Sequence, residues 1–210
     1  MKCVIVSGGE PPRKNDLAKH IKDAALVIAV DGAADIFDRW GLKPHFIVGD
    51  MDTADSKSVS RLVGNGAAAV TLPKEKNETD TEAAMTHALN AGASDIVMLG
   101  ATGRRFDHTM GNVAMLVRAA RAGAVCRIID KHNEMWAATG EHDVFGRIGQ
   151  TVSILPLTGD LTVTAANLLY PLENLKLGVD ASRGISNIFV KSPAHLSISG
   201  GYALIVKIIS

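Results

Sequence analysis

Short apolar runs alternate with helical patterns over the first 131 residues, and this alternation limits the possible folds more than any other feature. The strand-like runs lie at 3–7, 26–30, 45–49, 68–72, 95–99 and 125–129, and the helical patterns lie near 15–23, 33–40, 56–63, 79–91 and 108–122. A repeated strand–helix order requires right-handed crossovers between strands. The pattern therefore predicts a parallel sheet that is covered by helices on both faces.

The pattern changes after about Lys131. Runs such as TVSILPL, DLTVTAANL, SNIFVK, HLSISG and YALIVKIIS are rich in β-forming residues, and no convincing helix lies among them. Turn signals separate the runs, including Thr139-Gly140 and Gly200-Gly201. We therefore expect an α/β chain: a parallel-sheet, Rossmann-like domain over residues 1–131, then a small all-β sandwich over residues 132–210. The second domain is small, so we expect it to lean on the first domain or on a second copy of the chain.

The composition argues against several classes of partner. Lys and Arg together number 22, as do Asp and Glu, so the formal charge is zero and no general attraction to nucleic acid or membrane is expected. No apolar run approaches the roughly 18 to 20 residues of a membrane span. The first apolar run, MKCVIVSGG, is too short for a signal peptide and has the pattern of a strand, so the expected location is cytoplasmic. Cys3 and Cys126 lie in apolar runs and are expected to be buried, reduced thiols.

Aspartates follow four of the predicted strands: Asp31, Asp50, Asp80 and Asp107. The carboxyl ends of parallel strands share one edge of the sheet, where ligands of such folds bind. Carboxylates that crowd together repel one another, so a cluster of them favours a bound cation.

Asp50 and Asp52 are the strongest metal-binding candidates. Side chains two residues apart in an extended segment point to the same side, and carboxylate oxygens suit the hard ion Mg²⁺. A helix cap is the alternative explanation for this acidic loop, because Asp55 can cap the helix that starts near Ser56. Capping accounts for Asp55 but leaves Asp50 and Asp52 unexplained.

Two further loops have features of anion sites. Thr79 and Glu82 form a capping box at a helix start, which leaves Asp80 to face the sheet edge, while Lys74 and Lys76 either meet phosphate oxygens or are simply solvated. In the loop GATGRRFDH, at 100–108, glycines and arginines precede a helix N-terminus, where free N–H groups favour phosphate.

The second of these loops also offers candidate residues with open roles. Asp107 is a plausible N-cap of the following helix, and His108 is either a hydrogen-bonded structural residue or a base. The chain has neither a P-loop motif nor the glycine fingerprint of dinucleotide-binding proteins. On physical grounds alone, the segment SRGISN at 182–187 is only a polar turn.

Taken together, these segments resemble the thiamine pyrophosphokinase family along nearly the whole chain. The resemblance rests on Asp31-Gly32, GDMD at 49–52, EKNETD at 75–80, GATGRRFDH at 100–108, YPLENLKL at 170–177 and SRGISN at 182–187. It implies an α/β nucleotide-binding domain followed by a β-sandwich, in a homodimer. It also implies the transfer of pyrophosphate from ATP to the hydroxyl of thiamine, with Mg²⁺, leaving AMP.

The resemblance also implies roles for single residues. Asp50 and Asp52 would bind Mg²⁺ and orient the triphosphate, and Asp80 would join them as a metal ligand, directly or through water. Asp107 would lie near the reacting hydroxyl or the metal, as the candidate to accept or orient the hydroxyl proton. The remaining candidates for binding the nucleotide or thiamine are Asp31, Gly32, Lys76, Thr79, Arg105, His108, Ser182, Ser186 and Asn187. The serines and Asn187 would border thiamine in a pocket completed across the dimer interface.

This chain departs from the usual pattern of the family at Thr53, Asn77, Arg104 and Ile185. Thr53 keeps the hydroxyl of the usual serine, and Asn77 replaces a common aspartate. Arg104 stands at a usual glycine, and Ile185 stands at a frequent threonine, which puts one contact to thiamine in doubt. Two alternative functions remain open at this point: a pyrophosphokinase for another hydroxymethyl acceptor, such as a pterin, or a nucleotide-binding regulatory module without turnover.

Overall fold

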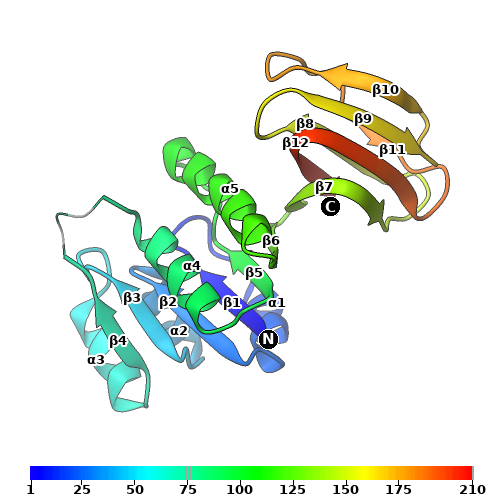
Figure 1. Cartoon of the computed structure of the whole chain (residues 1–210). Helices are drawn as coiled ribbons and strands as arrows, with labels where there is room; N and C mark the ends of the chain where they lie inside the picture. The colour runs from blue at the N-terminus through cyan, green and yellow to red at the C-terminus, as the bar shows by residue number, and fades with distance from the viewer. Residues whose placement is uncertain (74, 76, 210) are drawn as a thin grey trace. The chain divides into compact units, whose positions relative to one another are not determined.

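The computed structural model describes residues 1–73, 75 and 77–209, and Figure 1 shows the course of the chain. The chain divides into two compact units, Met1–Asp130 and Lys131–Ser210, which are described separately. Within the described ranges, no helix has both the length and the apolar character needed to cross a membrane.

The first unit alternates strands and helices as the sequence predicts. Its elements are β1 (Lys2–Val6), α1 (Lys14–Lys22), β2 (Leu26–Val30), α2 (Ala33–Trp40), β3 (Phe46–Gly49), α3 (Ser56–Gly64), β4 (Ala68–Thr71), α4 (Asp80–Asn90), β5 (Asp95–Leu99), α5 (Phe106–Arg121) and β6 (Val125–Ile129). Every predicted strand and helix of this half is confirmed, with boundaries within two residues.

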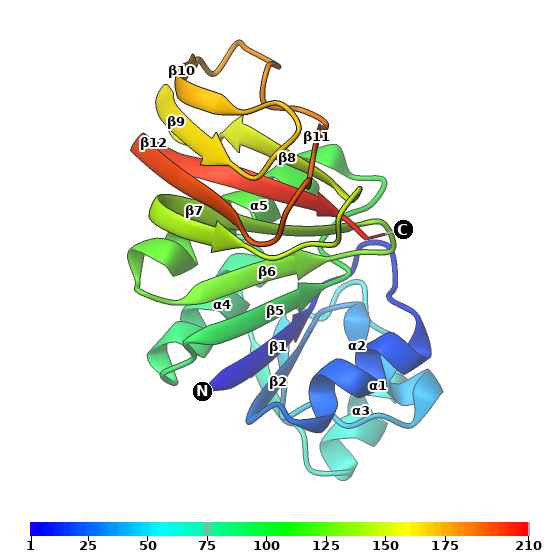
Figure 2. The same ribbon diagram turned by 90° about the vertical axis from the view of Figure 1, so that its right-hand side faces the viewer.

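The strands of the first unit form a parallel sheet in the order β6-β5-β1-β2-β3-β4. The chain steps outward from β1 to β4, and α4 then carries it back to β5 on the other side of β1. Because each crossover is right-handed, the change of direction moves α4 and α5 to the face opposite α1, α2 and α3, as Figure 2 shows. The fold class predicted for this half, a parallel sheet between helices, is confirmed.

Two helical layers explain the composition of the central strands. Every residue of β2 is buried, as are Cys3 to Val6 of β1, because a parallel sheet between helices has no face toward water. On the side of α1 and α2, the fully buried Leu17 and Phe37 pack on this sheet with Ile47 of β3. This packing holds the carboxyl ends of the strands in fixed positions.

The two cysteines are buried and free, as the sequence predicts. Burial raises the pKa of the Cys3 thiol to about 12, and burial also raises the pKa of Cys126. Since the thiolate is the reactive form, neither residue should react with a disulfide reagent at pH 8 in the folded protein. Denatured protein should release two equivalents of thiol per chain. Rapid labelling of the native protein would contradict this expectation.

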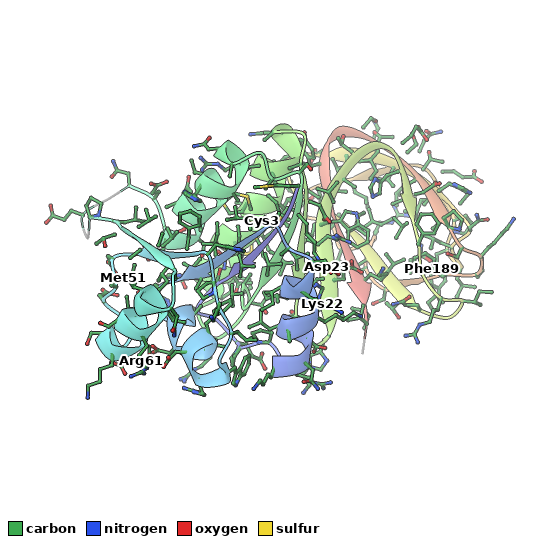
Figure 3. The ribbon with its side chains drawn as sticks, turned by 90° about the horizontal axis from the view of Figure 1, so that it is seen from below. Cys3, Lys22, Asp23, Met51, Arg61 and Phe189 are labelled. Atoms are coloured by element: carbon green, nitrogen blue, oxygen red, sulfur yellow. The ribbon has the colours of Figure 1, made fainter. Side chains whose placement is uncertain are left out.

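The second unit is built from antiparallel strands. They are β7 (Asn133–Val144), β8 (Thr151–Pro156), β9 (Leu161–Ala166), β10 (Leu172–Leu177), β11 (Asn187–Ile188) and β12 (Ala194–Ile208). β12 pairs with β7 over most of its length, while its first half also pairs with β9 and its second half with β8. The long strand thus belongs to two layers, and the apolar core of this unit includes the fully buried Phe189, which Figure 3 labels. The predicted all-β half is confirmed.

Two glycine-containing pairs predicted to be turns, Thr139-Gly140 and Gly200-Gly201, lie inside strands instead. Gly140 of β7 and Gly200 of β12 have φ values of 68° and 92°, and the pairing register between these strands shifts between Ile198 and Ala203. A glycine with left-handed φ inside a strand forms a bulge, which bends the strand without ending it. The runs HLSISG and YALIVKIIS are therefore one bent strand. The sequence pattern also does not identify β7, whose residues are largely polar.

Candidate active site

The site begins where two neighbouring strands end. The N–H of Asp31, directly after β2, donates to the carbonyl of Val48 in β3 over 3.0 Å, so Asp31 lies beside the end of β3. A Cβ at Gly49 would lie 3.0 Å from the Cβ of Asp31, and this close approach requires the glycine. Asp31 and Met51 have left-handed φ values of 45° and 61° (Met51 is labelled in Figure 3). Such backbone strain in non-glycine residues often marks functional sites.

The side chains of Asp31, Asp50 and Asp52 converge, and we call these three residues the acidic triad. Each offers a carboxylate oxygen within 4.8 Å of the other two; Asp31 and Asp50 are partly buried, and Asp52 is exposed. Oδ1 of Asp31 is buried and has no hydrogen-bond partner among the described residues. A buried oxygen without a partner is costly, and a divalent cation would satisfy it. The acidic triad therefore fits a hard ion such as Mg²⁺.

Short-range hydrogen bonds order the loop that carries the triad. The N–H of Asp52 donates to Oδ1 of Asp50 over 3.1 Å, and Oγ1 of Thr53 donates to Oδ1 of Asp52 over 2.9 Å. Asp55 caps α3 through the N–H of Lys57, as predicted. The N–H of Asp55 also donates to Oδ1 of Asp35 in α2 over 3.0 Å, which anchors the far end of the loop.

Gly32 has a steric reason to be glycine. It stands at the N-cap of α2, and a Cβ there would lie 3.2 Å from Cγ2 of Thr53. A side chain at this position would push against the loop that holds Asp50 and Asp52. Gly32 therefore lies beside the loop that carries Asp50 and Asp52, and its contact with a nucleotide stays a prediction.

The start of α4 lies at the same edge of the sheet. Oγ1 of Thr79 accepts the N–H of Glu82 over 3.2 Å, so half of the predicted capping box is present, whereas the Glu82 carboxylate pairs with Arg118 of α5. The buried hydroxyls of Ser7, after β1, and Thr81 lie 3.1 Å apart. This contact places the adjacent, partly buried Asp80 at the carboxyl edge of the strands.

Asp80 is not a member of the acidic triad. The three carboxylates that approach one another include Asp31, which was expected to contact the nucleotide, and do not include Asp80. Asp80 has interactions of its own within the protein. Lys76, the predicted phosphate ligand, and Lys74 lie outside the described residues.

Two residues at the start of α5 form an ion pair. Arg105 stands at the N-cap and Asp107 lies in the first turn, so the predicted N-cap role of Asp107 is wrong. The carboxylate of Asp107 accepts from Nε and Nη2 of Arg105 over 2.9 and 2.6 Å, and both side chains are exposed. These hydrogen bonds hold the pKa of Asp107 well below its usual range, which makes this carboxylate a weak proton acceptor. His108 is exposed beside it.

The loops after β1 and β5 form one backbone unit. The N–H of Gly9 donates to the carbonyl of Gly100 over 2.8 Å, and the N–H of Glu10 donates to the carbonyl of Thr102 over 2.7 Å. A Cβ at Gly9 would lie 2.3 Å from the Thr102 oxygen, so only glycine fits. These loops lie where the strand order changes direction, which is the position where open α/β sheets bind ligands.

The thiamine-side candidates lie in the second unit. Ser182 and Ser186 are exposed; Ser186 has a φ of 61°, and its N–H donates to Oγ of Ser153 over 3.0 Å. Asn187 is only 5% exposed, and its amide bonds to the backbone of Tyr170.

Reasoning from the sequence alone did not find three features of these sites: the membership of Asp31 in the triad, the anchor at Asp35 and the internal bonds of Asn187. The nearest signal was the position of Asp31 at a strand end. Placing Asp31 in the triad also requires knowing that β2 lies beside β3, and no local sequence pattern gives the order of the strands.

Two family models match this chain, one in each unit. The family model described as the catalytic domain of thiamin pyrophosphokinase matches residues 17–128. The model described as the vitamin B1 binding domain of thiamin pyrophosphokinase matches residues 141–202. The first match lies within the first unit and contains the acidic triad, and the second match lies within the second unit.

Whole-chain relatives agree with the family models. The chain is 28% identical to a thiamine pyrophosphokinase of Bacillus subtilis over 99% of both sequences. The crystal structure of a thiamine pyrophosphokinase from Bacillus subtilis covers the whole of both chains with a TM-score of 0.87 and 27% identity. A thiamin pyrophosphokinase structure from Geobacillus thermodenitrificans gives 0.84 and 26%, over 100% of this chain and 98% of that one. With family models that match more than half of its length, the chain belongs to the thiamine pyrophosphokinase family.

Proposed function

We propose that this chain transfers pyrophosphate from ATP to the hydroxyl of thiamine, giving thiamine diphosphate and AMP. The thiamine oxygen attacks the β-phosphorus, the bond from that phosphorus to the oxygen bridging to the α-phosphorus breaks, and AMP leaves with that oxygen. The hydroxyl proton passes to a base or to water. The observation that supports this function most is the acidic triad, with the unpartnered oxygen of Asp31, at the ligand-binding edge of the catalytic domain.

Charge neutralisation and positioning account for most of the catalysis in such transfers. Asp31, Asp50 and Asp52 would hold Mg²⁺, and Asp80 would join them from the start of α4. When bound, Mg²⁺ supplies positive charge to the triphosphate oxygens. Gly32, beside the loop that carries Asp50 and Asp52, would contact the nucleotide, with Thr79 and His108 as further candidates for contact with it.

The ion pair at the start of α5 has a specific consequence for this reaction. The pair uses two of the five N–H donors of Arg105, so Arg105 can bind a phosphate oxygen either with its remaining donors or by exchanging the carboxylate of Asp107 for the phosphate. An Asp107 released in this way would regain a more ordinary pKa and become a better proton acceptor. Arg105 and Asp107 would then act in sequence, with phosphate binding before proton transfer.

The remaining parts of the proposal concern the second domain and assembly. Residues 1–131 would form the ATP-binding catalytic domain, and residues 132–210 would bind thiamine and form a homodimer, so that the active site lies at the subunit interface. Ser182 and Ser186 would border thiamine.

A product assay tests the function directly. The protein is incubated with ATP, Mg²⁺ and thiamine, and the released nucleotide is identified by chromatography. We expect AMP and thiamine diphosphate in equal amounts, and neither when thiamine is omitted or EDTA is added. Release of ADP would indicate a plain kinase, and AMP formed only with a hydroxymethylpterin would indicate a different acceptor. Nucleotide binding without turnover for any acceptor would favour a regulatory module.

A further inference from the structure

The side-chain oxygen of Asn187 has both of its acceptor positions occupied by backbone N–H groups of the protein. Its Oδ1 accepts the N–H groups of Tyr170 and Ile188 over 3.0 and 2.9 Å, and its Nδ2 donates to the carbonyl of Tyr170 over 2.6 Å. A carbonyl-type oxygen has two lone pairs, and both are used here. Because Asn187 is also 5% exposed, it has little capacity to contact a ligand directly.

These bonds continue a short antiparallel pairing. The N–H of Val190 donates to the carbonyl of Asn167 over 3.0 Å, Phe189 bridges Leu168, and the N–H of Leu169 donates to the carbonyl of Ile188 over 2.8 Å. On its other side the same segment pairs with β8, through Asn187 to Val152 and Ile188 to Thr151, so residues 187–190 lie between β8 and the segment 167–171. At Asn187 the main chain faces β8, while the side-chain amide takes the place of a peptide group and pairs with Tyr170. Asn187 thus extends the link between the two segments by one residue, to Tyr170.

Asparagine is the residue that suits this geometry. Aspartate has the same shape and can accept the two N–H groups, but it has no donor for the Tyr170 carbonyl. Glutamine carries the same amide one methylene further from the backbone. Alanine would leave the N–H and the carbonyl of Tyr170 without these partners.

The segments joined by Asn187 carry exposed apolar side chains. Leu169 and Tyr170 are 48% and 60% exposed, and Ile185 and Val190, two residues before and three residues after Asn187, are 50% and 47% exposed. Ser186, a thiamine-side candidate, is the immediate neighbour of Asn187. Thiamine has two aromatic rings, one of them cationic, and apolar and aromatic side chains near a hydroxyl suit such a ligand.

We infer that Asn187 is a positioning residue for thiamine: it holds the Tyr170 segment against β8 and so sets the surface formed by Tyr170 and Ser186. This inference rests on the proposed function for the identity of the ligand. The hydrogen bonds of Asn187 are observed in the structure and do not depend on that function. A positioning residue of this kind affects the affinity for thiamine and leaves the ATP side of the reaction unchanged.

Steady-state kinetics of Asn187→Ala test the inference. We expect the KM for thiamine to rise about tenfold, the effect of losing hydrogen bonds worth about 1.4 kcal/mol in total, with the KM for ATP within about twofold of wild type. Asn187→Asp keeps the shape and the acceptors, so its KM for thiamine should rise less. Gln150→Ala is the matched control, because the side-chain amide of Gln150 also makes two backbone hydrogen bonds, with Arg147 and Ile208 and not with Tyr170, and it should leave the KM for thiamine unchanged.

Amide hydrogen exchange measured by NMR gives a readout that does not depend on turnover. The N–H of Tyr170 should exchange about tenfold faster in Asn187→Ala than in wild type, because its acceptor is gone. If Asn187→Ala does not fold, the KM for thiamine of Asn187→Asp decides the question, because this variant lacks only the donor to the Tyr170 carbonyl. A folded variant with an unchanged KM for thiamine, or with an equal rise in the KM for ATP, overturns the inference. If wild-type protein releases no AMP with thiamine, the proposed function fails. Unchanged exchange of the Tyr170 N–H in Asn187→Ala would show that Asn187 does not hold this segment, whatever the ligand is.

Discussion

Asp52→Asn should lower the kcat for AMP formation by about 100-fold or more at saturating ATP, thiamine and Mg²⁺, in line with the loss of a preorganised electrostatic group. Asparagine keeps the size of the side chain and can still accept from Thr53, so the loop should remain folded. What it removes is one of the three charges that converge in the acidic triad. Asp50→Asn should have an effect of the same size for the same reason.

The same loop contains a matched control. Asp55→Asn removes one negative charge five residues after Asp50, but asparagine caps a helix as well as aspartate does. Its turnover should stay within about twofold of wild type, because this carboxylate is outside the triad. Calorimetric titration with Mn²⁺ adds a readout besides activity: Asp52→Asn should weaken the binding of the ion, and Asp55→Asn should not. Near-normal turnover of Asp52→Asn at limiting Mg²⁺ would show that the metal assignment is wrong.

Gly9→Ala should destabilise the first unit by about 2–3 kcal/mol, the usual cost of forcing an atom into a packed site. A Cβ at Gly9 would lie 2.3 Å from the Thr102 oxygen and 2.6 Å from the Gly100 oxygen, and these are backbone atoms that cannot rotate away. The loops after β1 and β5 would have to separate, with loss of the hydrogen bond from Gly9 to Gly100. Urea denaturation followed by the fluorescence of Trp40, in a Trp136→Phe background, reports on this unit.

Gly8→Ala is the control that separates the steric clash at Gly9 from a general effect of replacing glycine by alanine in this loop. A Cβ at Gly8 would meet no atom within 4 Å, so Gly8→Ala should leave the urea midpoint nearly unchanged. Equal midpoints for Gly8→Ala and Gly9→Ala would contradict the close packing of the two loops. A lower midpoint for Gly9→Ala alone would support it.

Sequence reasoning worked where the signal was local. The helix and strand boundaries of the first unit follow from periodicity and from stop signals such as Gly41, which ends α2 with a φ of 67°. The cap at Asp55 follows from its place directly before a helical pattern. It failed at Gly200, because a glycine within a strand-rich region marks either a turn or a bulge, and only the pairing of β12 with β7 distinguishes the two.

By itself, the sequence determined the α/β order of this protein, the all-β second half and the candidate carboxylates, since each depends on residues within a few positions of one another. The tertiary structure decided which of those side chains meet. Asp31 joins Asp50 and Asp52 because β2 lies beside β3, and the buried amide of Asn187 reaches Tyr170 across 17 positions of the chain. Strand order and long-range contacts result from the packing of the whole domain, and no short stretch of residues encodes them.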